Sequence, residues 1–458
     1  MADFLLSVGI DIGTSTTQLI FSKLFIKNIA SASSVPRHEI VDKEIIYKSK
    51  IHFTPLKSAT EIDVTKALEI IKEEYKNAGI STSEPDTGAV IITGETARKE
   101  NARAVLQALS DFSGDFVVAT AGADLEGVLS GKGAGTDKIS DERHCVALNF
   151  DIGGGTTNIS VFNRGSEIDT ACFDIGGRLI KYENNIITYI SPKLKEIIKN
   201  EGFDIAEKQP FSSEKTKPLL KLMVDVLCDE LGLKQSKYYN LLITNKGLSK
   251  KINPDFITFS GGVAKAIYEK ENNPFVYGDI GVLLAEEILN SDIFKSYNVI
   301  MGNETIRATV VGAGSHTTEV SGSTIFYDEN SLPIKNLSVL KIENESNFKE
   351  EFERKIKRFD TSSPLAVALN GKSGISYQDL KNLASHIYDA SHSLAEPIVI
   401  IFNEDMAKSF GYIFKSICDK KIIIIDGISL KDEDFIDIGS PTASGEFLPV
   451  VIKTLLFQ

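Results

Sequence analysis

Apolar residues in this chain are arranged with two different periods, one typical of strands and one typical of helices. Apolar runs at Leu5–Ile10, Ala89–Thr93 and Cys145–Phe150 predict buried strands. Residues 64–77 carry apolar side chains three or four positions apart, which predicts an amphipathic helix with one face on a core. Because strands and helices alternate along the chain, the pattern predicts an α/β protein.

Two of the predicted strands end in nearly the same polar turn. Asp11–Thr17 reads Asp-Ile-Gly-Thr-Ser-Thr-Thr, and Asp151–Thr157 reads Asp-Ile-Gly-Gly-Gly-Thr-Thr. A stretch of alternating polarity follows each turn, so both segments predict strand, tight turn and strand, with an aspartate closing the first strand. Glycine lets an anion approach the backbone closely, and threonine hydroxyls and turn N–H groups can bind phosphate. The pair predicts a phosphate clamp with two sides.

The candidate ligands are the glycine and hydroxyl residues of both turns, namely Gly13, Thr14, Ser15, Thr16, Gly153, Gly154, Gly155, Thr156 and Thr157. Asp11 and Asp151 are the candidate Mg²⁺ residues, since that ion keeps much of its water and is bound by carboxylates. The alternative for each aspartate is a side-chain turn cap. The alternative for the turns themselves is a pair of ordinary glycine hairpins.

A P-loop does not explain the two turns, because neither has the lysine or the following helix of that motif. Asn370–Ser373 contains Gly-Lys-Ser, but Ala366 stands where the first glycine of the motif belongs. A third element favours nucleotide binding instead. Phe256–Phe259 predicts a buried strand, and Gly261 and Gly262 follow it directly before a predicted helix over residues 264–270. Such a turn lets an adenosine pack on bare backbone, although by itself it is also a generic turn.

The chain divides into three parts. Residues 1–140 predict a first lobe, and residues 141–328 predict a second lobe with a mostly helical insertion at about 180–250. The second lobe is expected to close with a strand at Ala308–Val311 and a glycine turn. After a linker near 328–333, residues 334–458 alternate between apolar runs and helical patterns, which predicts a C-terminal module with a small parallel sheet. Its predicted strands are 338–342, 365–369, 398–402 and 422–426, and its predicted helices are 348–359, 377–391 and 406–418.

Composition narrows the class of partner. The chain has 458 residues, of which 42% are hydrophobic, and its net charge is 50 − 63 = −13. An acidic chain of this kind is not expected to bind nucleic acid. No apolar run approaches the roughly 18–20 residues that span a bilayer, and the N-terminus carries no secretory signal. The four cysteines are scattered and predict buried apolar residues rather than a zinc site or disulfides.

If MgATP lies between the turns, an attacking water needs a group to orient it. Glu126 and Asp124 are the candidates for this role, and Arg98, Lys132 and Arg307 are candidates for assisting with charge. The six histidines form no evident ligand cluster, and the chain lacks the D-x-H-x-x-G cobalamin motif.

The three motifs resemble those of the actin, Hsp70 and sugar-kinase ATPase superfamily. By position, Asp11–Ser15 matches its first phosphate loop, Asp151–Thr156 its second phosphate loop, and Gly261 and Gly262 its adenosine motif. The resemblance implies an α/β fold of two ribonuclease-H-like lobes around a nucleotide cleft, with ATP and Mg²⁺ bound between them. It also places the segment Thr120–Glu126, with both Asp124 and Glu126, where the superfamily has its crossing between the lobes and a catalytic carboxylate.

A narrower resemblance covers nearly the whole chain. It rests on segments outside the nucleotide motifs, namely Val35–Arg37, Ile51–Leu56, Ile92–Ala102, Gly131–Gly135, Gly312–Gly322 and Asp437–Pro441. These are similar to segments of the ethanolamine ammonia-lyase reactivating factors, the EutA family. Members are implied to act as chaperone-like ATPases that release damaged cobalamin from the lyase, so that intact adenosylcobalamin binds again.

The resemblance further implies ethanolamine ammonia-lyase as the partner and a place in the cytoplasm or inside a bacterial microcompartment, and it leaves a homo-oligomer open. Two other functions share the same ATP site. A small-molecule kinase would transfer the phosphoryl group to a hydroxyl, and an actin-like ATPase would form filaments. The C-terminal module, which the ATPase fold does not require, is the candidate for contact with the lyase, and the alternative is a role in stabilising the protein.

Overall fold

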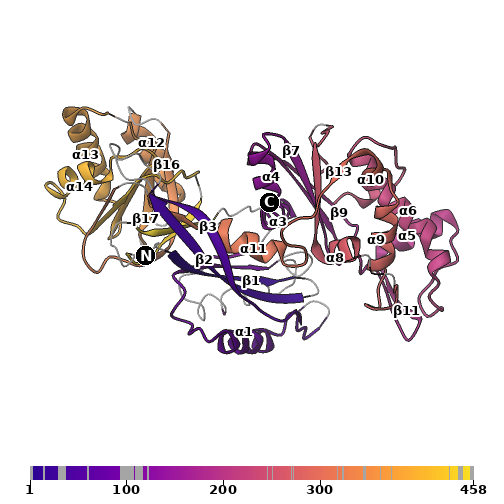
Figure 1. Ribbon diagram of the computed structural model, residues 1–458. Helices are drawn as coiled ribbons and strands as arrows, with labels where there is room; N and C mark the ends of the chain where they lie inside the picture. The colour runs from indigo at the N-terminus through magenta and orange to yellow at the C-terminus, as the bar shows by residue number, and fades with distance from the viewer. Residues whose placement is uncertain are drawn as a thin grey trace.

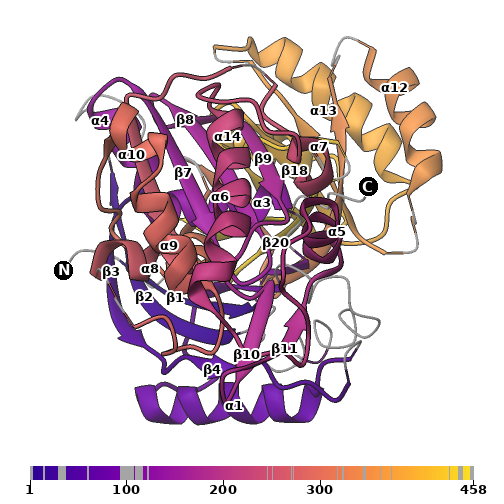
Figure 2. The same cartoon turned by 90° about the vertical axis from the view of Figure 1, so that its right-hand side faces the viewer.

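Three large β-sheets follow one another across the molecule, with helices on their faces (Figures 1 and 2). In Figure 1 the C-terminal module lies on the left, the first lobe in the centre and the second lobe on the right. The computed structural model describes residues 4–13, 16–28, 38–58, 61–92, 108, 117–120, 123–244, 246–249, 251–269, 271, 273–316, 318–321, 324–343, 347–359, 361, 363–372, 374–432, 434–441 and 447–453.

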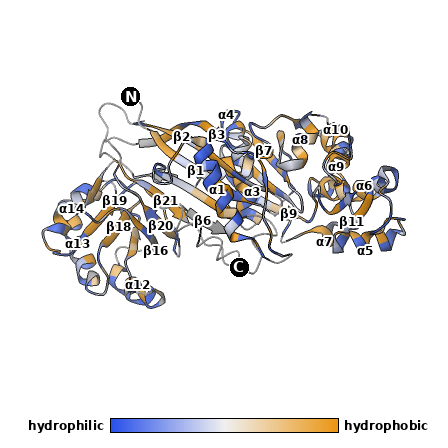
Figure 3. Cartoon of the chain, turned by 90° about the horizontal axis from the view of Figure 1, so that it is seen from below, coloured by the Kyte–Doolittle hydropathy of each residue, from blue (hydrophilic) through white to orange (hydrophobic). Residues whose placement is uncertain are grey.

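The first sheet has the strand order β3-β2-β1-β5-β6, and β4 pairs with β2. Its strands are β1 (Phe4–Ile12), β2 (Thr16–Asn28), β3 (His38–Lys48), β4 (His52–Phe53), β5 (Thr87–Ile92) and β6 (Val117–Thr120). The first three run antiparallel, whereas β5 is parallel to β1 and β6 is parallel to β5. Helix α1 (Val64–Ala78) is the predicted amphipathic helix, and its outer side is hydrophilic in the view from below (Figure 3).

The second sheet repeats this topology. Its order is β13-β12-β7-β8-β9, formed by β7 (Val146–Ile152), β8 (Thr157–Asn163), β9 (Ser166–Phe173), β12 (Phe256–Ser260) and β13 (Asn298–Val299). Here too an antiparallel meander, β7-β8-β9, continues into two parallel neighbours, β12 and β13. The two sheets are therefore copies of one plan, as expected for two ribonuclease-H-like lobes.

Helices cover the outer face of the second sheet. The segment predicted as helical begins instead with a hairpin of β10 (Ile180–Glu183) and β11 (Ile186–Ile190). The helices on this face are α5 (Pro192–Glu201), α6 (Ser213–Glu230), α7 (Tyr239–Leu242), α8 (Gly261–Glu269), α9 (Gly281–Leu289) and α10 (Asp292–Ser296). Helix α4 (Thr136–Glu142) lies on the inner face beside α3 (Ala123–Gly133), where the Thr136 hydroxyl contacts that of Thr258. Leu148, Phe150 and Ile152 of β7 share one hydrophobic core with α5, α6, α8 and α9.

Two helices cross between the lobes, and each packs on the sheet of the other lobe. Helix α3 (Ala123–Gly133), which the sequence places in the first lobe, contacts β7, β8 and β9, whereas α11 (Ala308–His316) contacts β1, β2 and β5. A Cβ on Gly133 would lie 1.8 Å from the Ala308 carbonyl oxygen, and one on Gly312 would lie 1.9 Å from that of Leu129. The two helices therefore touch backbone to backbone, and glycine is required at both places.

The strand predicted at Ala308–Val311 is wrong, because these residues begin α11. A run of β-branched residues favours a strand locally, but here Val310 and Val311 pack with Ile20 of the first sheet from a helical backbone. The glycine-rich segment that follows is part of this helix rather than a turn, and His316 is its last residue.

The C-terminal module contains the predicted parallel sheet. Its order is β14-β21-β20-β16-β17-β18-β19-β15, in which the four central strands β16 to β19 run parallel. The strands are β14 (Thr318–Val320), β15 (Ile325–Tyr327), β16 (Ile334–Ile342), β17 (Leu365–Leu369), β18 (Ile398–Phe402), β19 (Ile422–Ile425), β20 (Phe435–Ile438) and β21 (Pro449–Lys453). The helices are α12 (Phe348–Lys355), which continues into the 3₁₀ turn η3 (Ile356–Arg358), α13 (Tyr377–Ser391) and α14 (Ala407–Lys415). The sequence pattern located these central strands and helices correctly.

This module is built onto the first lobe. Phe447 is buried with Leu5, Leu24 and Ile26 of the first sheet. Val451 of β21 is buried with Ala89 and Ile91 of β5 and with Leu129 of α3. Strand β14 and strand β15, both before the predicted boundary at 328, belong to the C-terminal sheet. Among the described residues, no helix is long and apolar enough to cross a membrane.

Candidate functional site

The two phosphate turns have the same backbone geometry where the structure describes both. Gly13 N donates a hydrogen bond to Thr16 O, and Gly153 N donates to Thr156 O, each at 2.9 Å. Asp11 lies opposite Gln18 in its hairpin, and Asp151 lies opposite Asn158 at the equivalent position. The duplicated sequence therefore gives duplicated hairpins. Thr14 and Ser15 lie outside the described residues.

Both aspartates lie on the sheet faces that are turned toward the crossing helices. Strand side chains alternate between faces, and Val8, Ile10 and Ile12 pack in the core on the α1 side. Asp11 is therefore on the opposite face with Gly9, where a Cβ would lie 2.6 Å from the Val310 carbonyl oxygen of α11. In the second sheet, Leu148, Phe150 and Ile152 face the outer helices, which leaves Asp151 on the inner face. Asp11 is 8% exposed and Asp151 is 5% exposed.

The adenosine turn adjoins the second phosphate turn. Strand β12 is parallel to β7 and places Ser260 opposite Asp151. Gly261 has φ +85°, and a Cβ there would lie 2.4 Å from the Ile152 carbonyl oxygen, so the turn needs glycine. Gly262 is exposed, and a Cβ at this position would meet no atom within 4 Å. This pair therefore combines a close backbone contact with open space, as an adenosine site requires.

A contact between the lobes lies beside the two predicted phosphate turns. On the first lobe, Phe53 lies opposite Thr16 in β4, and the hydroxyl of Thr54 donates to Gly13 O at 2.7 Å. On the second lobe, Arg178 N donates to Gly154 O at 2.6 Å. The guanidinium carbon of Arg178 is 5.6 Å from the centroid of the Phe53 ring, within cation–π range.

Sequence reasoning missed Arg178, because it stands 21 positions after the second turn, well outside the motif. Its side chain also contacts the Asp279 carboxylate, with 3.4 Å between Nε and Oδ2. The available signal was the preceding pair of glycines. A Cβ on Gly176 would lie 2.5 Å from Gly154 O, so this segment packs directly under the phosphate turn. Arg178 thus brings a positive charge to the second turn.

Burial sets the electrostatics of Asp151. It raises the pKa of the Asp151 carboxyl to about 6, and the hydrogen bond from Ser260 opposes this rise. Ser260 Oγ donates to Oδ1 at 2.7 Å, and no described residue donates to Oδ2. A buried carboxylate in this state is stabilised by a nearby cation. The chemistry of the site therefore fits Mg²⁺, held through water by two aspartates of opposite lobes. Within the described residues, no group of three or more His, Cys, Asp or Glu side chains offers an alternative metal site.

The candidate ligands of the second turn differ in their exposure. Gly153, Gly154, Gly155 and Thr156 are partly exposed at the second turn. Thr157 is fully buried, and its hydroxyl donates to Ile175 O at 2.7 Å. The Thr157 hydroxyl is therefore engaged within the fold, and its role as a nucleotide ligand stays a prediction.

The two candidate carboxylates on α3 point to different sides of that helix. Asp124 Oδ1 accepts a hydrogen bond from Thr170 of β9 at 2.7 Å. Glu126, two residues later, is about 200° further around the helix, on the side of Gly133 and α11. Asp124 is therefore tied to the second sheet, and Glu126 remains the candidate for orienting water. Arg307 donates to Ser49 O at 3.0 Å, and Arg98 lies outside the described residues.

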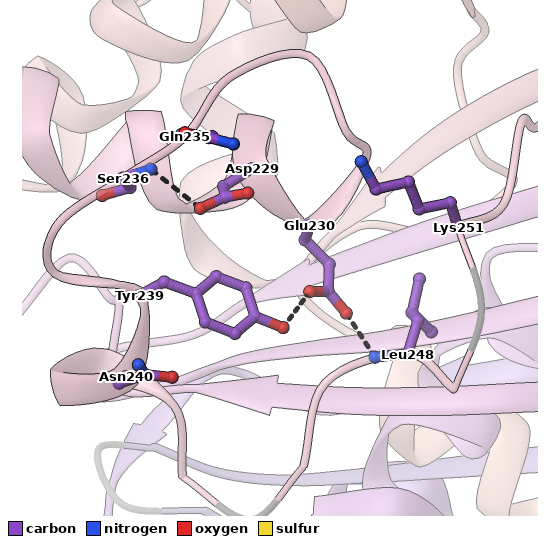
Figure 4. Close-up of a pocket in the computed structure, with 8 residues that line it drawn as sticks. All are labelled: Asp229, Glu230, Gln235, Ser236, Tyr239, Asn240, Leu248 and Lys251. Carbon is purple, nitrogen blue, oxygen red and sulfur yellow. Dashed lines mark hydrogen bonds between the residues drawn. The ribbon is translucent and has the colours of Figure 1, made fainter.

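A separate hollow of about 510 Å³ lies at the end of α6, remote in sequence from the phosphate turns (Figure 4). Its lining includes Asp229, Glu230, Tyr239 and Lys251. The Glu230 carboxylate accepts hydrogen bonds from the Tyr239 hydroxyl and from Leu248 N. Glu230 thus fastens α7 and the following loop to α6, which is a structural role.

Comparison with known proteins decides the family. The family model described as "Ethanolamine utilisation protein EutA" matches residues 3–458. The chain belongs to this family. Two curated proteins named ethanolamine ammonia-lyase reactivase EutA, from Escherichia coli (strain K12) and Salmonella typhimurium (strain LT2), are each 34% identical to it over 460 residues. The matches cover 99% of this chain and 98% of each relative.

Two solved structures are similar to the chain at low identity and low TM-score. The type II variant of the Ppx/GppA phosphatase of Aquifex aeolicus is 14% identical, with a TM-score of 0.39, over 68% of this chain and 99% of that chain. The ethanolamine utilization protein EutJ of Carboxydothermus hydrogenoformans is 16% identical, with a TM-score of 0.34, over 68% of this chain and 89% of that chain. The family matches confirm the prediction from sequence that the chain is a member of the EutA family.

Proposed function

We propose that this chain is an ATP-dependent reactivating factor for adenosylcobalamin-dependent ethanolamine ammonia-lyase, located in the cytoplasm or in a bacterial microcompartment. The observation that carries the proposal is the match to two curated reactivases over essentially their whole length. The twin phosphate hairpins with their buried aspartates support ATP as the nucleotide. Cobalamin is bound by the lyase in this scheme, since the chain has no cobalamin motif.

In this proposal each group of predicted site residues has its own role in binding MgATP or in hydrolysis. The backbone N–H groups around Gly153–Gly155 and Gly13 bind phosphate oxygens, and Gly261 and Gly262 hold the adenosine. Asp11 and Asp151 hold the water shell of Mg²⁺, which supplies charge compensation for the transferred phosphoryl group. Glu126 orients the attacking water from α3. Because Asp11 and Asp151 belong to different lobes, the loss of the terminal phosphate changes the contacts that hold the lobes together.

The direct test uses the lyase. Purified protein, MgATP and adenosylcobalamin are mixed with ethanolamine ammonia-lyase inactivated by cyanocobalamin, and lyase activity is followed. We expect activity to return only when ATP and Mg²⁺ are both present. A chain that hydrolyses ATP but restores no activity would contradict the proposed function and favour one of the other ATPase classes.

Gly262 offers a prediction for nucleotide binding. Gly262→Val should weaken ATP binding by about tenfold or more, because the branched side chain enters the open space that the adenosine needs. Gly262→Ala should weaken binding less and should not lower the melting temperature, since alanine favours the helix that begins here. Calorimetric titration with ATP measures both. Unchanged affinity in the valine variant would place the nucleotide elsewhere.

The C-terminal module offers a prediction for coupling. Tyr377 on α13 and Tyr412 on α14 are 70% and 64% exposed. Exposed aromatic side chains commonly contribute to protein contacts. The double variant Tyr377→Ala and Tyr412→Ala should lower the rate of lyase reactivation about fivefold or more, and ATP hydrolysis should stay unchanged.

The matched control is Tyr277→Ala, which removes a tyrosine that is 50% exposed on the second lobe. Its reactivation rate should stay close to that of the unaltered chain. Reactivation at full rate by the double variant would mean that this part of the module does not meet the lyase.

A further inference from the structure

A chain of buried hydrogen bonds leads from the start of α4 to the carboxylate of Asp151. Thr136 Oγ1 is 2.6 Å from Thr258 Oγ1, and Thr258 Oγ1 donates to Asn149 Oδ1 at 2.9 Å. Asn149 Nδ2 donates to Ser260 Oγ at 2.9 Å, and Ser260 Oγ donates to Asp151 Oδ1 at 2.7 Å. The four residues that precede Asp151 in this chain are fully buried.

The register of two parallel strands creates this chain. In the pairing of β7 with β12, Asn149 lies opposite Thr258 and Asp151 lies opposite Ser260. Residues two apart on a strand share a face, so all four side chains lie on the inner face of the second sheet. Thr136, the first residue of α4, reaches the same face. If the inner-face positions of β7 and β12 were apolar, Asp151 would have no neighbouring side chain to form a hydrogen bond with.

The hydrogen bonds all point in one direction. Each hydroxyl has a single hydrogen, and Thr258 donates its hydrogen to Asn149, so Thr136 must be the donor to Thr258. If the Asn149 amide were reversed, Ser260 would have to donate to Asn149, and the carboxylate would lose its donor. The ionised form of Asp151 therefore selects the observed direction, in which each bond polarises the next.

The strand pair β1 and β5 of the first sheet cannot form the corresponding chain. At the equivalent positions, Gly9 lies opposite Ala89 and Asp11 lies opposite Ile91. None of Gly9, Ala89 and Ile91 has a side chain that can form hydrogen bonds. The residues opposite and before the two aspartates therefore differ between the two parallel strand pairs, although the turns are nearly identical in sequence.

We infer that Ser260, Asn149, Thr258 and Thr136 are positioning residues that fix the carboxylate of Asp151, with Oδ1 bound and Oδ2 available to the cleft. The inference deepens the proposed function and rests on the role of Asp151 at Mg²⁺. Asp151 is held in place before the nucleotide arrives. Partners that orient a metal-binding carboxylate commonly change metal affinity by about 10–100-fold when they are lost.

A pair of variants at Thr258 tests the inference. Thr258→Val keeps the shape of the side chain and removes the hydroxyl, whereas Thr258→Ser keeps the hydroxyl and removes a methyl group. The measured quantity is the Mg²⁺ concentration that gives half-maximal ATP hydrolysis at saturating ATP. We expect it to rise about tenfold in the valine variant and to change by less than about twofold in the serine variant.

Ser260→Ala should give a larger rise than Thr258→Val, because it removes the donor to the carboxylate itself. Affinity for ATP in the absence of Mg²⁺ should stay within about twofold in all three variants. Equal Mg²⁺ requirements in the valine and serine variants, or changes that follow only the melting temperature, would overturn the inference. An unaltered chain without Mg²⁺-dependent hydrolysis would instead overturn the proposed function. An inactive Asp151→Ala variant beside a Ser260→Ala variant of ordinary Mg²⁺ dependence would overturn the positioning role alone.

Discussion

Asp151→Ala is expected to lower Mg²⁺-dependent ATP hydrolysis by about 100-fold or more, and Asp11→Ala is expected to do the same. Each aspartate ends the first strand of a phosphate hairpin and lies buried on the face turned toward the other lobe. In the proposed function, removal of either carboxylate would take away one of the two charges that hold Mg²⁺ and its water. Phosphate release with and without Mg²⁺ measures the effect.

The fold should survive both substitutions. Burial of the Asp151 charge is unfavourable in the absence of a cation. The alanine variant should therefore lose no more stability than the small cavity left by the shorter side chain causes. Circular dichroism and thermal melting provide the control. A folded Asp151→Ala chain with unchanged turnover would remove that residue from the metal site, and the same result for Asp11→Ala would remove its counterpart.

Gly312→Val should have the largest effect on stability, lowering the free energy of unfolding by more than about 3 kcal/mol. A Cβ at Gly312 would lie 1.9 Å from the Leu129 carbonyl oxygen, and backbone atoms of two helices cannot move aside as a flexible side chain can. The helices α3 and α11 would have to separate, and with them the lobes. Urea unfolding of the soluble chain measures the loss.

Gly262→Val is the matched control for this variant, because it adds the same side chain near the start of a helix where a Cβ meets no atom within 4 Å. It should unfold close to the unaltered chain. A Gly312→Val chain as stable as this control would mean that the crossing helices lie further apart than described.

The sequence was sufficient where a short segment determines its own structure. The hairpins at Asp11 and Asp151 depend on glycine and threonine within a few residues, and the central strands of the C-terminal sheet are buried on both faces, so they are continuous apolar runs. The resemblance to the ATPase superfamily predicted two lobes that follow each other along the chain. These features needed no knowledge of distant contacts.

The sequence did not predict features that depend on contacts between residues far apart in the chain. Residues 308–311 form a helix because α11 must fit between Gly9 of β1 and Leu129 of α3, and no local pattern shows this. Arg178 joins the site only because its segment packs under the phosphate turn. The module at 334–458 also proved less separate than its sequence indicated.

Removal of that module would not give a clean test of its role. A chain ending near residue 331 would lose Phe447 and Val451, which are buried against β1, β2 and β5. The first lobe would then expose apolar surface that the intact chain covers. For this reason the surface tyrosines of α13 and α14, and not a deletion, separate coupling from folding.

The attachment of β21 to the first lobe also fixes the order in which the chain can mature on the ribosome. The core of the second lobe draws its residues from positions 148–293, so it can close while the rest of the chain is still being made. The first lobe begins the chain and builds its core on the α1 side from residues 8–92, but Leu5, Leu24 and Ile26 stay exposed until Phe447 leaves the ribosome. A prematurely terminated product would therefore expose apolar surface on the first lobe, which favours its degradation by proteases.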